Sequence, residues 1–299
     1  CNIGAHGAAT TSTASCRELK KKAITTLDQN GRRRQRRRPK RQTRRCAPST
    51  SKFPWIESPD VIKGSKRLTA LLPMKAHSAR VTSKNFRMIA GKPLFRWILD
   101  TLCETPEIDL VVINTDARGI LADNGLNDGD YGGKVMVRDR KPEICGDFVS
   151  MNLVLADDIA AIKSDHYLMT HTTNPLLSVA TIRNMIGIYE KAEAVGKADS
   201  LFTVTRRQTR FYTPEGEPIN HDPKNLIRTQ DLPPYMEENS VCYLFSAASF
   251  AKTDARIGER PVLFETPRLE SVDIDENSDW FMAESLLRRV AAGEELPEG

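Results

Sequence analysis

Three cationic side chains follow the first apolar run of the folded region. Lys75, Arg80 and Lys84 lie within ten residues of one another, shortly after residues 67–73. An arginine can bind a phosphate through two parallel hydrogen bonds, whereas a lysine acts as a compact point charge. The segment matches neither the Walker A pattern nor the dinucleotide-binding G-x-G-x-x-G pattern. It therefore indicates either a loop that binds a triphosphate or a solvated basic loop.

Two carboxylates, Asp273 and Asp275, flank one apolar residue near the end of the folded region. In a strand, residues two apart point to the same face, so both carboxylates would aim together while Ile274 is anchored in the core. Two carboxylates with phosphate oxygens make a hard oxygen shell that suits Mg²⁺. Without a metal, their mutual repulsion would raise the pKa of one of them. The alternative is a surface pair beside Asp279, which would cap the following helix.

The apolar pattern predicts the elements that must position these side chains. Strands are predicted at residues 67–73, 109–114, 134–138, 166–170, 200–205 and 240–245, and helices at 93–102, 148–162, 179–190 and 279–289. Strands that alternate with helices form an α/β fold, a Rossmann-like, mostly parallel sheet flanked by helices. Such sheets bind ligands at the carboxyl ends of their strands. Polar clusters follow three predicted strands, at residues 75–85, 115–116 and 171–174, and this convergence predicts one pocket.

Residues 206–235 interrupt the alternation. They contain Pro214, Gly216, Pro218 and Pro223 among polar residues, a composition typical of turns rather than of a core strand. We therefore expect a hairpin that protrudes from the sheet.

Several blocks resemble the acylneuraminate, or CMP-sialate, cytidylyltransferases, which are related to the CMP-KDO synthetases. The blocks are PMKAHSARVTSKN at 73–85 with GKPL at 91–94, RKPEICGD at 140–147, HTTNPL at 171–176, RTQDLP at 228–233 with EN at 238–239, and DID at 273–275. Their order and spacing carry the resemblance, which covers most of residues 67–290. Lys75 stands where the family has Arg, and His171 stands where it has Gln.

The resemblance implies a nucleotide-diphospho-sugar transferase type of fold in a domain at residues 67–290. It implies transfer of CMP from CTP to the anomeric hydroxyl of a sialic-acid-like 2-keto sugar acid, with release of pyrophosphate. Mg²⁺ would be bound by Asp273 and Asp275. The expected catalytic residues are Lys84, Asp273 and Asp275. The expected nucleotide contacts are Lys75, Ser78, Arg80, Lys84, Asn85, Arg140 and Ser150, and the expected sugar contacts are His171, Thr173, Arg228, Gln230 and Asn239.

Residues 206–235 resemble the dimerisation segment of the family, which implies a homodimer in which this segment completes the sugar site of the partner. Two alternatives stay open. Arg80 is compatible with a CMP-KDO-type synthetase. A non-catalytic nucleotide- or RNA-binding protein could use the Arg-rich tail, although the presence of Lys84 and of both aspartates argues against a decayed enzyme.

The charge of the chain is unevenly distributed. Residues 1–50 contain 14 Lys and Arg but two acidic residues, whereas the remainder has 30 basic and 37 acidic residues. We expect residues 1–52 to be a disordered basic tail: a nuclear-import or nucleic-acid-binding arm, an organelle transit peptide, or an extension without a role. Nucleic acid is not expected elsewhere, and the compartment is cytoplasmic by default. No apolar run reaches the ~20 residues of a membrane span, and six cysteines without a C-x-x-C pair indicate free thiols.

Overall fold

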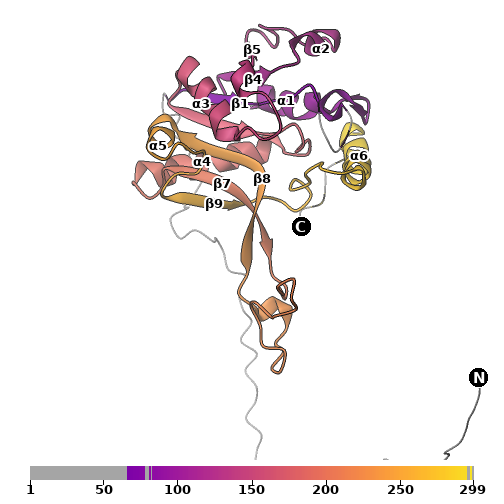
Figure 1. Cartoon of the computed structure of the whole chain (residues 1–299), viewed down its shortest axis with the longest axis vertical. Coiled ribbons are helices and arrows are strands. Elements are labelled where there is room, and N and C mark those ends of the chain that lie inside the picture. The colour runs from indigo at the N-terminus through magenta and orange to yellow at the C-terminus, as the bar shows by residue number, and fades with distance from the viewer. Residues whose placement is uncertain (1–65, 78–80, 82, 295–296, 298–299) are drawn as a thin grey trace, which may run out of the picture. The chain divides into compact units, whose positions relative to one another are not determined.

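A seven-stranded mixed sheet with the order β5-β4-β1-β6-β8-β7-β9 forms the centre of the protein (Figure 1). The computed structural model describes residues 66–77, 81, 83–294 and 297. The strands of the sheet are β1 Leu68–Leu71, β4 Leu110–Thr115, β5 Val135–Asp139, β6 His166–Thr170, β7 Ser200–Arg207, β8 Tyr235–Ser246 and β9 Pro261–Glu265. A separate antiparallel pair joins β2 Met88–Ile89 to β3 Lys92–Pro93.

Four neighbouring strands of the sheet, β5, β4, β1 and β6, are mutually parallel. β8 runs antiparallel to both β6 and β7, while β9 is parallel to β7. The carboxyl ends of the four parallel strands therefore meet at one edge, where open α/β sheets bind their ligands.

Helices cover both faces of the sheet. The helices are α1 Leu94–Glu104, α2 Arg118–Asp123, α3 Met151–Ala161, α4 Val179–Ala194, α5 Ala247–Thr253 and α6 Asn277–Ala291, with three 3₁₀ turns, η1 Lys84–Phe86, η2 Pro142–Ile144 and η3 Thr229–Asp231. On one face, side chains of α3 and α5 pack against Tyr167, Tyr243 and Phe245 of the sheet. α1 and α4 contact each other and cover the other face. Because both faces are covered, every residue of β4 is buried.

A second core cluster joins the acidic segment to the start of the domain. Ile274 and Trp280 pack with Leu94 at the beginning of α1 and with Ile89 of the small antiparallel pair. The guanidinium of Arg87 lies 4.3 Å from the ring centroid of Trp280, a distance typical of a cation–π contact. This packing fixes α6 and the residues before it beside the cationic loop.

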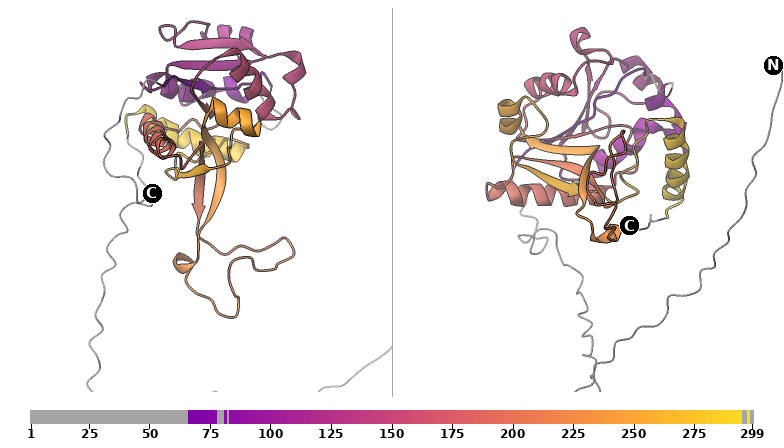
Figure 2. Two further views of the ribbon diagram at one scale, coloured as in Figure 1. Left: turned by 90° about the vertical axis from the view of Figure 1, so that its left-hand side faces the viewer. Right: turned by 60° about the horizontal axis from the view of Figure 1, so that its bottom comes forward.

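An arm formed by the residues between β7 and β8 projects from the sheet (Figures 1 and 2). The two strands pair as far as Arg207 with Tyr235, and their register shifts between Phe202 and Val204. Beyond this ladder the arm contains an isolated bridge between Tyr212 and Pro218, and the short turn η3. The expected protruding hairpin is therefore present.

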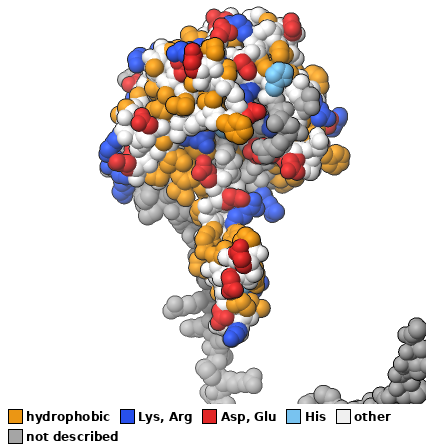
Figure 3. Space-filling view, in the orientation of Figure 1, with side chains coloured by type: hydrophobic (Ala, Val, Ile, Leu, Met, Phe, Trp, Pro, Cys, Tyr) orange, Lys and Arg blue, Asp and Glu red, His pale blue; other side chains and the backbone are white. Residues whose placement is uncertain are grey.

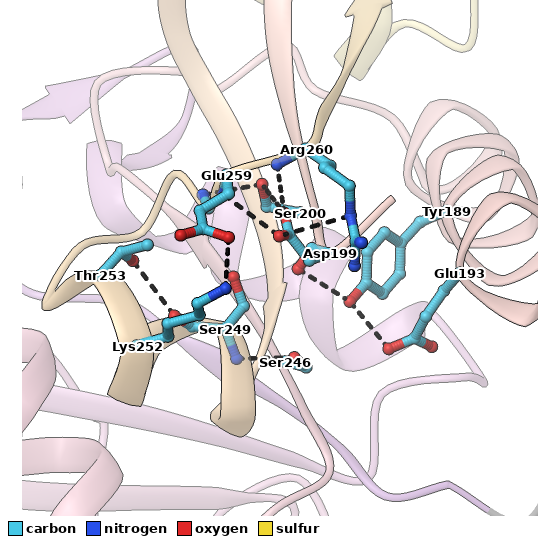
Figure 4. A network of polar contacts seen from close by, with 11 residues as sticks. Tyr189, Glu193, Asp199, Ser200, Ser246, Ser249, Lys252, Thr253, Glu259 and Arg260 are labelled. Atoms are coloured by element: carbon cyan, nitrogen blue, oxygen red, sulfur yellow. Dashed lines mark hydrogen bonds and ion pairs between the residues drawn. The ribbon is translucent and has the colours of Figure 1, made fainter. Parts of the chain in front are cut away.

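A polar network holds the start of β9 beside the start of β7 (Figure 4). The carboxylate of Asp199 accepts hydrogen bonds from the backbone N–H groups of Glu259 and Arg260, at 3.2 and 2.9 Å. The hydroxyl of Ser200 accepts one from Gly258 at 2.8 Å. A Cβ added to Gly258 would overlap Asp199 and Ser249, so this position requires a glycine.

Most of the helices and strands predicted from the sequence are present in the structure. The strand at 166–170 has the predicted bounds, and the other five predicted strands and all four predicted helices are present with shifted ends. β9, α2 and α5 were not predicted. The basic tail at 1–52 lies outside the described residues. Among the described helices, none has the length and apolar character that crossing a bilayer requires.

Candidate active site

Lys84 joins the cationic loop to the acidic segment. It opens the 3₁₀ turn η1, and its side chain is mostly buried. Its ammonium group donates a hydrogen bond to the carbonyl of Ile274 at 2.5 Å and lies 3.7 Å from the carboxylate of Asp275. The cation and the carboxylates therefore meet, although they are far apart in the sequence.

Asn85 links the same loop to the carboxyl end of β6. Its amide nitrogen donates to the carbonyl of Lys75 at 2.8 Å, and its amide oxygen accepts from the hydroxyl of Thr172 at 2.6 Å. The side chain is buried. Because both polar atoms of the amide already have partners, Asn85 holds the loop in place.

Asp273 and Asp275 lie in an extended segment between β9 and α6, so the predicted strand at these residues is wrong. The backbone N–H of Ile274 donates to the carbonyl of Thr173 at 3.0 Å, and Ile274 is fully buried. Ile274 is thus anchored in the core as predicted. The anchor is a bond to the loop after β6, with no neighbouring strand.

The carboxyl group of Asp273 is held in an unfavourable environment for a charge. The pKa of Asp273 is raised, chiefly by burial and also by the negative charge of Asp275. A hydrogen bond from the side chain of Thr173 opposes this rise. One carboxylate oxygen, Oδ1, is buried and has no hydrogen-bond partner among the described residues. Such an atom costs free energy unless a cation or a donor meets it.

Asp279 has the capping role that the alternative interpretation gave it. One carboxylate oxygen of Asp279 accepts hydrogen bonds from the backbone N–H groups of Asp275 and Glu276, at 3.0 and 2.8 Å. With the side chain of Glu276 it forms a capping box at the start of α6. This box fixes the backbone that carries the carboxylate pair.

The donor set of this segment fits Mg²⁺. No group of three or more His, Cys, Asp or Glu side chains suited to a metal occurs in the described part of the chain. Mg²⁺ commonly takes one or two protein carboxylates and completes its shell with phosphate oxygens and water. Asp273, with its unpartnered oxygen, and Asp275 would be those two carboxylates.

Arg140 lies beneath the same edge of the sheet. Its buried guanidinium donates to the side-chain oxygen and to the carbonyl of Asn114, both at 2.8 Å, and to the carbonyl of Met74 at 3.3 Å. The side chain of Asn114 in turn donates to Asp158 at 2.8 Å. Arg140 therefore ties the segment that follows β1 to the carboxyl end of β4.

Lys75, on the outer part of the cationic loop, pairs with Asp147 of the loop after β5 at 2.8 Å. This hydrogen bond and the charge of Lys75 lower the pKa of Asp147. Ser150 is exposed at the amino end of α3 and makes no capping hydrogen bond with its side chain. Ser78 and Arg80, the remaining predicted nucleotide contacts, lie outside the described residues.

His171 follows β6 directly and is half-buried. Burial, together with the positive charges of Arg256 and Lys84, lowers the pKa of His171 to about 3. The imidazole is therefore neutral at physiological pH. A general base works best when its pKa is near the working pH, so this environment favours a hydrogen-bonding role for His171 over proton abstraction.

Two of the remaining predicted sugar contacts lie on a different part of the fold from His171 and Thr173. Arg228 and Gln230 lie on the projecting arm, where Arg228 forms a bidentate pair with Asp231 at 2.7 and 2.9 Å. Asn239 lies on β8 at the register shift, and its amide donates to the hydroxyls of Thr205 and Thr266 at 3.1 and 2.8 Å. Within one chain, Asn239 thus joins β7, β8 and the segment after β9.

Sequence reasoning missed Arg256, whose positive charge acts on His171. Arg256, in the loop between α5 and β9, donates a hydrogen bond to the hydroxyl of Tyr243 at 2.9 Å and lies 3.8 Å from the centroid of its ring. It also lies 3.7 Å from the carboxylate of Glu238. Arg256 belongs to no recognisable motif, so only the arrangement in space reveals it.

A mostly parallel α/β sheet with a cation and a carboxylate pair at the carboxyl ends of its strands is the arrangement of an α/β protein that binds its ligand at this edge. Comparison with known proteins narrows this class, because the profile of the cytidylyltransferase family matches residues 69–273. The chain therefore belongs to the cytidylyltransferase family.

Curated relatives share about a quarter of their residues with this chain. The N-acylneuraminate cytidylyltransferase of Oncorhynchus mykiss is 27% identical over 247 residues, which are 79% of this chain and 54% of that protein. The CMP-N,N'-diacetyllegionaminic acid synthase of Legionella pneumophila is 25% identical over 237 residues, which are 74% of this chain and 96% of that protein. The chain thus spans about half the length of the fish protein and nearly all of the bacterial one.

Solved structures share the fold at lower identity. The 4-diphosphocytidyl-2C-methyl-D-erythritol synthase of Anaerococcus prevotii has a TM-score of 0.52 at 14% identity, covering 75% of this chain and 97% of that one. A CMP:2-keto-3-deoxy-manno-octonic acid synthetase complexed with CTP has a TM-score of 0.51 at 12% identity, covering 75% and 99%. The Rossmann-like, mostly parallel sheet flanked by helices that the sequence predicts is confirmed.

Proposed function

We propose that residues 67–290 transfer CMP from CTP to the anomeric hydroxyl of a sialic-acid-like 2-keto sugar acid and release pyrophosphate. The observation that carries this proposal is the contact of Lys84 with Ile274 and Asp275. It brings a buried ammonium group beside two carboxylates at the ligand-binding edge of the sheet. The names of the fish and Legionella relatives, and of the pseudaminic acid cytidylyltransferase of Campylobacter jejuni, support the sugar class.

The proposed reaction is one displacement at phosphorus. The anomeric oxygen forms a bond to the α-phosphorus of CTP, and the bond from that phosphorus to the bridging oxygen of the leaving pyrophosphate breaks. The hydroxyl proton passes to water. Such reactions are accelerated mainly by positioning and by neutralisation of charge.

Each group at the site has a role in that displacement. Lys84 neutralises charge on the triphosphate, with Lys75 and Arg80 as further phosphate contacts. Asn85 fixes the loop, while Arg140 and Ser150 border the nucleoside. Asp273 and Asp275 would bind Mg²⁺. That ion supplies charge neutralisation at the phosphates and a lower pKa for the attacking hydroxyl.

We also propose that the arm makes the enzyme a homodimer. Arg228, Gln230 and the arm as a whole then serve the sugar site of the partner, because the arm that carries them projects from the sheet (Figure 1). Apolar side chains on this arm and its base are exposed to solvent, namely Tyr212, Ile219, Leu226, Ile227, Tyr235 and Met236. Figure 3 shows apolar side chains on the surface of the arm.

Pyrophosphate release tests the proposed reaction. The chain is incubated with CTP, Mg²⁺ and, one at a time, N-acetylneuraminate, a diacetyllegionaminic acid, a pseudaminic acid and KDO. We expect turnover with at least one nine-carbon acid and a loss on the order of 10²-fold in the Asp275→Ala variant. The matched control is Glu284→Ala, which removes a carboxylate that pairs with Arg288 on α6. Absence of turnover with every acid would refute the function, and equal rates for Asp275→Ala and the parent would refute the metal assignment.

A further inference from the structure

The cluster around Arg256 lies at the edge of the sheet where the sugar must enter, and the proposed catalytic groups leave it unexplained. One nitrogen of its guanidinium donates to the sulfur of Met169 at 3.7 Å, and Met169 is the neighbour of Tyr243 in the β6–β8 ladder. The backbone N–H of Arg256 donates to the side chain of Asn152 in α3 at 3.4 Å. Arg256 therefore lies between the carboxyl end of β6 and the amino end of α3.

This position places Arg256 close to groups of the nucleotide site. β6 continues into His171, Thr172 and Thr173, and the last two contact Asn85 and the acidic segment. Ser150, which precedes α3, borders the predicted nucleoside position. A sugar acid whose anomeric hydroxyl reaches the α-phosphate would lie across this end of β6.

The charge of Arg256 is only partly compensated. Among the described residues, its guanidinium donates to one oxygen, the hydroxyl of Tyr243, and to the weakly accepting sulfur of Met169. The one carboxylate near it, that of Glu238, is 3.7 Å away and 42% exposed. The side chain of Arg256 itself is 20% exposed. Because a guanidinium carries five donor hydrogens in a planar fork, donors remain for an incoming anion.

We propose that Arg256 binds the carboxylate of the sugar acid and so makes the enzyme specific for acidic sugars. The inference rests on the proposed function and deepens it. Tyr243 and Glu238 act as positioning residues, because the ring of Tyr243 packs against the guanidinium, its hydroxyl accepts a hydrogen bond from it, and the carboxylate of Glu238 lies beside both. An arginine fork matches the geometry of a carboxylate.

The test compares an acid with its neutral ester. Pyrophosphate release is measured with the best acid of the panel and with its methyl ester, for the parent, Arg256→Gln, Arg256→Lys and the control Arg260→Gln. Arg260 belongs to the same loop, is 62% exposed and faces Asp199. We expect kcat/KM of the parent to favour the acid by about 10-fold or more, the size of a hydrogen bond between charged groups. This preference should fall below about 3-fold in Arg256→Gln, be intermediate in Arg256→Lys and persist in Arg260→Gln, while KM for CTP changes less than about 2-fold.

The ratio separates recognition from a structural role. A variant that merely loosened Tyr243 would lower the rates for acid and ester together and keep the preference of the parent. That result, or equal rates of acid and ester in the parent, would overturn the inference and leave the proposed function intact. Should Arg256→Gln fail to fold, Arg256→Lys decides by the same ratio. A parent without turnover on any acid would overturn the proposed function, and the inference with it.

Discussion

At the scale of single residues, the candidate active site holds a buried carboxylate that lowers the stability of the fold. Asp273 holds a buried carboxylate oxygen without a hydrogen-bond partner among the described residues, and Asp275 and Asp279 add negative charge near it. Buried charge without compensation destabilises a fold, and such strain is typical of functional sites. The carboxylate of Asp273 is therefore retained for what it binds.

Replacement of Asp273 by Asn tests this conflict between stability and function. Asn keeps the acceptor for Thr173 and removes the buried charge, so we expect the free energy of unfolding to rise by roughly 1 kcal/mol at pH 7.5. Activity should fall on the order of 10²-fold. Urea unfolding and pyrophosphate release measure the two effects. Glu284→Gln, which removes a half-buried charge paired with Arg288 at the surface of α6, should change the stability by less than about 0.5 kcal/mol; a destabilised Asp273→Asn would contradict the argument.

The meeting of Lys84 with the carboxylates could be predicted, because the resemblance assigns both motifs to one catalytic site. The partners of Asn239 could not be predicted. Its amide donates a hydrogen bond to Thr266, which follows β9, a strand that sequence reasoning missed. Arg140 is predicted to contact the nucleoside, and its observed bonds go to the segment after β1 and to the carboxyl end of β4. A motif names a side chain, but distant parts of the chain decide which atoms it contacts.

At the scale of elements, β9 was missed because its five residues, PVLFE, hold only a short apolar run without alternation, although Val262 and Phe264 are buried and Leu263 is exposed at the sheet edge. The predicted strand at Asp273 and Asp275 was wrong for a related reason. Alternation of side chains between two faces is typical of a strand, but a strand also needs a neighbouring strand to pair with. The backbone N–H of Ile274 instead donates to one carbonyl of the loop after β6. Side-chain alternation alone does not reveal whether a neighbour exists.

At the junction of β7 and β9, the packing around Gly258 allows a prediction about stability. Gly258→Ala should destabilise the fold by roughly 2 kcal/mol, because the new Cβ would overlap Asp199 and Ser249 and disturb their network. Gly187→Ala is the matched control within α4, where the new Cβ meets no atom within 4 Å. That variant should be more stable than the parent by about 0.5–1 kcal/mol. Thermal unfolding of both proteins gives the answer, and the same sign for the two would contradict the packing described.

The contact of α4 with β6 makes a prediction about pH. Burial alone would raise the pKa of Glu193, but hydrogen bonds from His166 and Lys66 outweigh it and lower that pKa to about 2, from an ordinary value of 4.5. A carboxyl with a lowered folded-state pKa stabilises the protein above its unfolded pKa, and this stability is lost as the pH falls through the folded value. Glu193→Gln should therefore cost the most at pH 7, and the difference from the parent should shrink between about pH 5 and pH 2.

The pKa of Glu190, on the same helix, shifts in the opposite direction from that of Glu193. Burial raises its pKa, so ionisation of Glu190 opposes folding as the pH rises. Glu190→Gln should then be at least as stable as the parent at pH 7, with an advantage that decreases toward low pH. Urea unfolding at a series of pH values measures both variants. Parallel pH profiles for Glu193→Gln and Glu190→Gln would refute the two environments.

At the scale of the whole molecule, the arm carries exposed apolar side chains that a single copy leaves in water. Ile219 and Leu226 are 52% and 61% exposed. If the proposed dimer forms through the arm, the double variant Ile219→Lys and Leu226→Lys should be a monomer where the parent is a dimer, because buried lysine charges oppose association. Sedimentation velocity at several concentrations measures the change. Val195→Lys, at an exposed apolar position after α4, should leave the dimer intact, and an unchanged dimer in the arm variant would exclude these two side chains from the interface.

The bond between Lys84 and Ile274 spans 190 positions of the chain. During synthesis on the ribosome, β1 and the cationic loop are made early, but the carbonyl that receives the ammonium of Lys84 appears only after the last strand of the sheet. A growing chain therefore cannot complete the proposed triphosphate site until the residues just before α6 have left the exit tunnel. Nucleotide capture by stalled chains of increasing length would begin at that point and would report the moment at which the domain closes.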